Sequence, residues 1–161
     1  MSNILDMWEV SMSYEEKATW ISTFVTVLVA GIYCSFVLNQ MGSMPLAQIA
    51  YQKPMLMAIG AIIIATIVGM ILMSIGSAIA AEIRHRGSSD DIGRKDERDD
   101  HINRRGELVG YYVSSVGILG VIALAMLRAD QFWIANALFL TMMIGGLVSS
   151  VVKIVIYRRG Y

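Results

Sequence analysis

The residues best suited to chemistry in this sequence are carboxylates and histidines at helical spacing. Glu82 and His85 lie three residues apart, and Glu97 and His101 lie four apart, with Glu107 on nearly the same face as the second pair. Side chains three and four residues apart are neighbours on a helix. An inward-facing Glu-x-x-His pair is the unit of di-iron bundles, and Glu and His side chains also bind zinc.

Two observations weaken a metal site built from these five residues. The sequence holds one Glu-x-x-His pair, whereas a di-iron bundle uses two. Both histidines also lie where apolar segments meet water, among residues of mixed charge, so a solvated helical surface accounts for the same pattern. We therefore predict no cofactor, and a divalent metal held by this set stays open as an alternative.

No other group of residues indicates catalysis. The single Cys34 cannot form an intrachain disulfide, and neither it nor a histidine has a partner at matching depth for a Ser-His-Asp or Cys-His set. No glycine-rich loop follows a strand pattern. The formal net charge is zero, which argues against direct nucleic-acid binding. These observations favour a protein that is not an enzyme.

Long apolar segments must position these side chains. Of 161 residues, 56% are hydrophobic and 16% are charged, against about 25% charged in a soluble domain. The uncharged segments are 18–52, 54–81, 108–127 and 131–152. Each can span a bilayer, where backbone groups must bond within a helix. We expect one all-α domain over residues 1–161, a four-helix transmembrane bundle.

Turn and capping signals place the helix ends. The expected helices cover about 14–38, 55–84, 96–127 and 131–157, with a polar loop over 85–95. Ser13 and Glu16 have capping-box spacing, and Pro54 suits the first turn of the second helix. The second and third helices exceed one bilayer crossing, so we expect both to extend into the cytoplasm.

Charge is concentrated in residues 84–107, which hold seven of the thirteen basic residues and seven of the thirteen acids. Four crossings place this stretch and both termini on one side, with eleven basic residues, and leave only Lys53 and Arg128 on the other. Basic residues are retained in cytoplasmic loops, so we expect both termini in the cytoplasm and a multi-pass protein of the inner membrane.

The start of the third helix is expected to form a charged cytoplasmic surface. Its members are Asp96, Glu97, Asp100, Arg104 and Arg105. Turned outward, this surface meets a protein partner; turned inward, it forms an ion-pair network beside the end of the second helix, with Arg84 and Arg86. We favour the inward network, because a projecting second helix needs a packing partner.

Small residues four apart predict where helices approach closely. The first stripe is Ala61, Ala65 and Gly69, the second is Gly106, Gly110 and Ser114, and the third is the pair Gly146 and Ser150. We expect these stripes to face other helices, within the chain or in a homo-oligomer.

Several strings in this sequence are similar to those of one family. They are residues 12–17 (MSYEEK), residues 96–99 (DERD) with Ile102 and Glu107, residues 130–138 (DQFWIANAL) and residues 157–160 (YRRG). Together they resemble an uncharacterised family of small four-helix prokaryotic membrane proteins of actinobacterial type with an Asp-Glu-Arg-Asp motif. The resemblance implies an integral membrane protein often encoded beside a small helix-turn-helix regulator. It implies no activity.

These features predict a small regulatory or sensory membrane protein whose charged cytoplasmic loop meets a partner. The expected partners are membrane lipids, a cytoplasmic regulator and further copies of the chain. Two alternatives stay open. One is a metal-dependent membrane enzyme that uses the Glu and His residues at the ends of the second and third helices. The other is a protein that binds a lipid or an apolar ligand between its helices.

Overall fold

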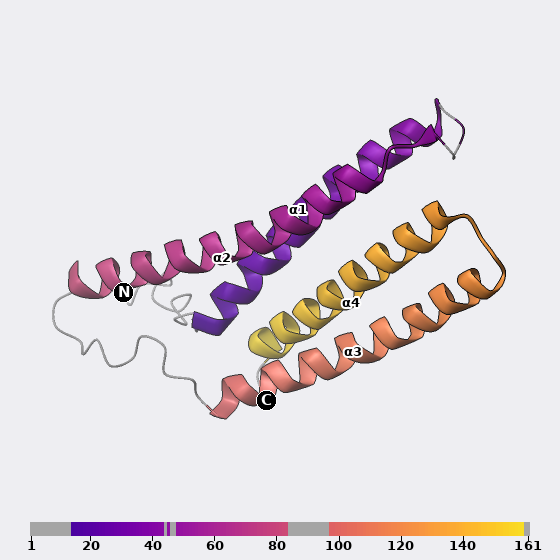
Figure 1. Cartoon of the computed structure of the whole chain (residues 1–161). Helices are drawn as coiled ribbons and strands as arrows, with labels where there is room; N and C mark the ends of the chain where they lie inside the picture. The colour runs from indigo at the N-terminus through magenta and orange to yellow at the C-terminus, as the bar shows by residue number, and fades with distance from the viewer. Residues whose placement is uncertain (1–13, 44, 46–47, 84–96, 160–161) are drawn as a thin grey trace, which may run out of the picture.

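The computed structural model describes residues 14–43, 45, 48–83 and 97–159, which form four helices and no strand. The helices are α1 (Tyr14–Met41), α2 (Gln52–Ile83), α3 (Glu97–Met126) and α4 (Gln131–Arg159) (Figure 1). All four are long and apolar enough to cross a bilayer. The chain is therefore an all-α, multi-pass membrane protein. The expected four-helix fold is confirmed, with every helix end within three residues of its predicted place.

The helices pack as an open row. The main packing pairs are α2 with α1, α1 with α4, and α4 with α3. Figure 1 shows α1 and α2 as one long hairpin and α3 and α4 as another, with α4 nearer to α1. The two helices that flank residues 84–96 therefore lie at opposite edges of the row, and α4 is the helix that joins the two hairpins.

Small residues bring α3 and α4 into close contact. A methyl group added at Gly110 would lie 2.7 Å from the carbonyl oxygen of Gly145 and 2.8 Å from the Cβ of Ser149. One added at Gly117 would overlap the side chain of Thr141. Lipid is as apolar as the helices, so packing at this range is what holds them together in a bilayer. We call this contact the α3–α4 seam.

The three predicted small-residue stripes differ in whether they contact another helix. The second stripe lies along the seam, where Gly106 and Gly110 are buried. On α4 the residues in contact are Gly145 and Ser149, one position before the expected Gly146 and Ser150, and the space around Gly146 is open. The first stripe is divided: Gly69 meets the side chain of Ile21 on α1, whereas Ala61 is exposed.

The connection between α3 and α4 is short because Arg128 reverses the chain direction. Its φ of 55° lies in the left-handed region. The N–H of Arg128 donates to the carbonyl oxygen of Ala125, and the N–H of Ala129 donates to that of Leu124, both at 3.0 Å. This is the Schellman arrangement, which satisfies the last carbonyl groups of a helix. It lets α4 start within a few residues of the end of α3.

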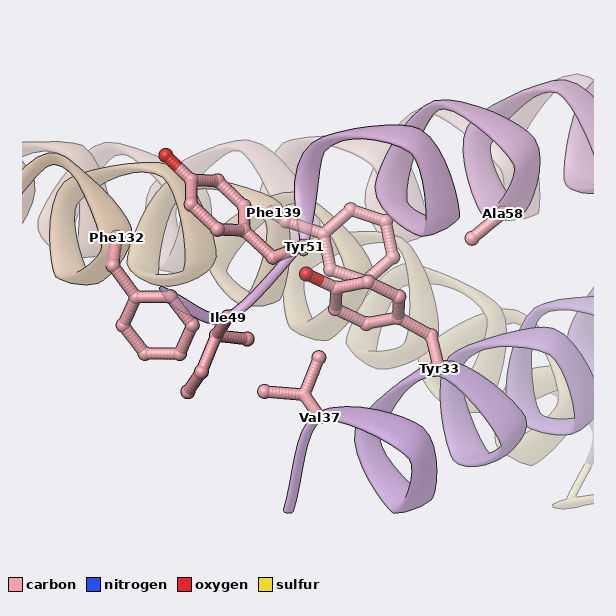
Figure 2. Close-up of a cluster of buried hydrophobic side chains, with 7 residues drawn as sticks. All are labelled: Tyr33, Val37, Ile49, Tyr51, Ala58, Phe132 and Phe139. Atoms are coloured by element: carbon pink, nitrogen blue, oxygen red, sulfur yellow. The ribbon is translucent and has the colours of Figure 1, made fainter. Parts of the chain in front are cut away.

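The two hairpins meet in a buried cluster near the α1–α2 and α3–α4 connections. We call this end of the molecule the hairpin end. The members of the cluster are Tyr33, Val37, Ile49, Tyr51, Ala58, Phe132 and Phe139 (Figure 2). The rings of Tyr33 and Phe139 lie 4.7 Å apart, and Tyr51 meets Phe132 edge-on at 5.2 Å. The Tyr33 hydroxyl donates to Asn136 Oδ1 at 2.7 Å. The connection after α1 thus folds onto α4, and it fixes one hairpin against the other.

Candidate functional site

The starts of α1 and α3 and the ends of α2 and α4 lie at one end of the molecule, which we call the terminal end (Figure 1). The Tyr14 hydroxyl lies 2.6 Å from the Ser74 hydroxyl. Ser74 is therefore level with the start of α1, and residues 75–83 of α2 continue past it. The residues of the charged surface that the structure describes lie at this end.

Three consecutive residues at the start of α1 each bond a different helix. Consecutive residues of a helix with 3.6 residues per turn point in well-separated directions, so three of them reach neighbours on several sides. The bonds join Tyr14 to Ser74 of α2 at 2.6 Å, Glu15 to the amide of Asn103 of α3 at 3.3 Å, and Glu16 to Arg158 of α4 at 3.0 Å. The first turn of α1 thus ties the whole row together.

Polar contacts also join α3 to α4 at this end. The Tyr157 hydroxyl donates to Asp99 Oδ1 at 3.0 Å, and Lys153 Nζ pairs with Glu107 Oε1 at 3.3 Å. Ile102, whose side chain is fully buried, lies between the two acids along α3. The acids in the first turn of α3 also complement the positive end of its helix dipole. We call these bonds and those of α1 the terminal polar network.

Two carboxylates of the network are buried, with 7% of Glu16 and 8% of Asp99 exposed. A buried charge is costly without a partner. The Arg158 guanidinium forms an ion pair with Glu16, and the Tyr157 hydroxyl donates to Asp99. The sequence did not predict that Glu16 pairs with Arg158. It predicted a capping box of Glu16 with Ser13, which lies outside the described part of the chain. The signal was available, because four crossings bring the acids of residues 14–16 beside the basic residues 158–159.

The described part of the charged surface of α3 faces outward. The ion-pair network expected with the arginines at positions 84 and 86 stays a prediction. The described members of the surface, Glu97, Asp100, Arg104 and Arg105, are exposed, as is the neighbouring His101. The packing face of α3 instead holds Asp99, Ile102 and Gly106, which are buried. Since α3 packs on α4 and not chiefly on α2, charges away from that face remain accessible. Asp96 and the arginines at positions 84 and 86 lie outside the described residues.

The residues proposed as metal ligands are not brought together where the structure describes them. Glu97 and His101 are exposed, and Glu107 bonds Lys153. The side chain of Glu82 and the whole of His85 lie outside the described part. Among the residues described, no three His, Cys, Asp or Glu side chains form a group that could hold a metal ion.

The described surface includes a hollow at each end of the molecule. One, of ≈ 410 Å³, lies at the hairpin end between residues 48–52 and 130–132. The other, of ≈ 400 Å³, lies at the terminal end between α3 and α4, with basic side chains from α3 along it. The second therefore adjoins the charged surface.

Comparison with family models, with curated proteins and with solved structures finds no match to this chain.

Proposed function

We propose that this chain is a small regulatory or sensory membrane protein that acts on a cytoplasmic partner through the exposed start of α3. One observation carries the proposal. The face of α3 with Asp99 is bonded into the terminal polar network, while Glu97, Arg98 and Asp100 around it are exposed. The first turn of α3 is thus held firmly on one side and open on the other.

This arrangement links the charged surface to the packing of the membrane helices. Asn103 of α3 bonds α1, and Asp99 of α3 bonds α4. A change in how α1 meets α4, for example at the pair of Glu16 and Arg158, would reach the start of α3 through these bonds. A partner that prefers one arrangement of the surface would then report on the state of the helices.

The side of the membrane and the class of partner follow from charge and resemblance. The terminal end carries the excess of basic residues that is typical of the cytoplasmic side. The sequence between α2 and α3, residues 84–96, is also rich in charged residues. The resemblance to proteins encoded beside a helix-turn-helix regulator favours a cytoplasmic regulator as the partner. The resulting role is that of a membrane-bound subunit that holds or releases such a regulator.

Site-specific photo-cross-linking in the native host tests this proposal. A photoreactive amino acid is placed at Glu97 or Asp100 on the charged surface, and at Leu127 beyond the far end of α3 as the matched control. Leu127 is 79% exposed, so accessibility does not separate the positions. We expect one discrete protein adduct from the first two positions and none from Leu127, with mass spectrometry identifying a cytoplasmic protein.

Charge reversal sharpens the result. Glu97→Lys combined with the photoreactive residue at Asp100 should reduce the adduct, because a charged partner surface is sensitive to the sign of its contacts. Lys17→Glu, an exposed reversal on α1, should leave it unchanged. Failure to form a protein adduct at either α3 position would refute the proposal, and so would equal adducts from Leu127.

A further inference from the structure

The hollow between α3 and α4 at the terminal end combines basic and apolar walls. Its volume is ≈ 400 Å³. His101, Arg104 and Arg105 line its outer part, and all three are exposed. Leu108 and Val109 of α3, with Val152 and Ile156 of α4, form the rest of the wall. The polar and apolar parts therefore follow one another along the helix axis.

This order of side chains matches the boundary of a bilayer. The uncharged stretch of α3 begins directly after Glu107, so Leu108 and Val109 are among the first residues at hydrocarbon depth. His101, Arg104 and Arg105 lie within two turns on the water side, at headgroup depth. The groove thus presents positive charge where lipid phosphates lie and an apolar wall where acyl chains lie.

We propose that this groove binds one anionic phospholipid, with its phosphate against Arg104 and an acyl chain along Val109 and Val152. Basic pockets between transmembrane helices are suited to anionic headgroups. Arginine donates in a planar fork that matches the geometry of a phosphate. The proposal is independent of the proposed function, because it needs no protein partner and uses residues nearer the membrane than Glu97 and Asp100.

Charge complementarity selects this occupant. A zwitterionic lipid would leave the positive charge of Arg104 uncompensated. The described residues that line the groove include no acid, which disfavours a cationic ligand. An apolar peptide or helix would cover Arg104 and remove its charge from water, which is costly.

Native mass spectrometry of the full chain released from nanodiscs tests the site. Nanodiscs contain phosphatidylglycerol and phosphatidylcholine in equal amounts, and the retained lipid is counted. We expect the protein to retain one phosphatidylglycerol about fivefold more often than phosphatidylcholine, since a basic residue near the headgroup contributes about that factor. Arg104→Gln should remove most of this preference. Lys17→Gln, which removes an exposed basic residue of α1 at the same end, should preserve it.

A second pair of variants tests the apolar wall without altering charge. Val109→Trp fills the groove and should lower retention of phosphatidylglycerol at least threefold. Val116→Trp is the control, because Val116 lies two turns along α3, is 71% exposed and does not line the groove. Each variant is first checked for an unchanged melting temperature and monodispersity in detergent, and a variant that fails is replaced by Arg104→Ala or by Val152→Trp.

Three results would overturn the proposal. Equal retention of the two lipids would exclude a charge-selective site. An equal loss in Arg104→Gln and Lys17→Gln would mean diffuse attraction to the whole terminal end. Displacement of the bound lipid by millimolar inorganic phosphate would mean that the groove recognises free phosphate and that the acyl chain contributes nothing.

Discussion

The two hairpins of this protein are built on different kinds of contact. At Gly110, on α3, the atom closest to an added methyl group is a backbone oxygen, that of Gly145 at 2.7 Å. At Gly69, on α2, it is the Cγ2 methyl group of Ile21, also at 2.7 Å. A side-chain methyl group can move by a small change in its torsion angle, whereas a backbone oxygen moves only with its helix. The α3–α4 pair is therefore rigid at its contact, and the α1–α2 pair is adaptable.

Polar contacts follow the same division. Bonds from Tyr157 to Asp99 and from Lys153 to Glu107 join the terminal halves of α3 and α4. Between α1 and α2 the corresponding contact is the hydroxyl pair of Tyr14 with a serine. In the row of helices, α2 is an edge helix that packs mainly on α1. We infer that α2 is the helix most free to shift while the others hold the charged surface in place.

The largest expected effect is at the α3–α4 seam. Gly110→Leu should lower the free energy of unfolding in detergent by about 1–3 kcal/mol, because the added side chain forces the two backbones apart. Gly120→Leu is the matched control on the same helix, since nothing lies within 4 Å of a methyl group at that position. A Gly110→Leu protein as stable as the control would show that the two helices do not meet at this seam.

A smaller effect is expected at the hairpin end, where Tyr33 donates to Asn136. Asn136→Leu should cost about 1 kcal/mol, since it leaves a buried hydroxyl without its acceptor. Adding Tyr33→Phe should recover part of that loss, because both polar groups are then absent. The measurement is a double-mutant cycle of unfolding free energies. Strict additivity of the two substitutions would contradict the bond between α1 and α4.

The smallest effect is predicted for the α1–α2 pair. Gly69→Ala should change the free energy of unfolding by less than about 0.5 kcal/mol, because the helix-propensity gain of alanine offsets the movement of Ile21. Gly110→Ala, tested in parallel, should be destabilising. If both substitutions destabilise the protein equally in a thermal melt, then the α3–α4 contact is no more rigid than the α1–α2 contact.

Much of the fold could be predicted because apolar segments of bilayer length have few alternatives. The limits of each helix followed from the charges and turn residues that end the segments. Helix rotation was harder to predict, because every face of a membrane helix is apolar. Ala61 had the right spacing yet is exposed, although Gly69 of the same stripe faces α1, and on α4 Gly145 makes the contact that was expected of Gly146.

The charged end shows a second limit of the sequence. Glu97, His101 and Asp99 all occur in the first turns of α3, and spacing alone does not reveal which of them faces another helix. The structure buries Asp99 against Tyr157 and exposes the other two. The choice depends on the order of helices in the row, because α3 packs on α4. Helix order was not determined by length, charge or periodicity.

The central claim is that four crossings place the charged surface of α3 in the cytoplasm and the hairpin end outside. Cysteine labelling in whole cells tests this claim most directly. Single cysteines replace Ser43, in the connection after α1, or Glu97, at the start of α3, with Cys34 changed to serine; both positions are exposed. An impermeant maleimide should label the cysteine at position 43 in intact cells and the one at position 97 only after permeabilisation. Labelling of both positions from the same side would contradict the account.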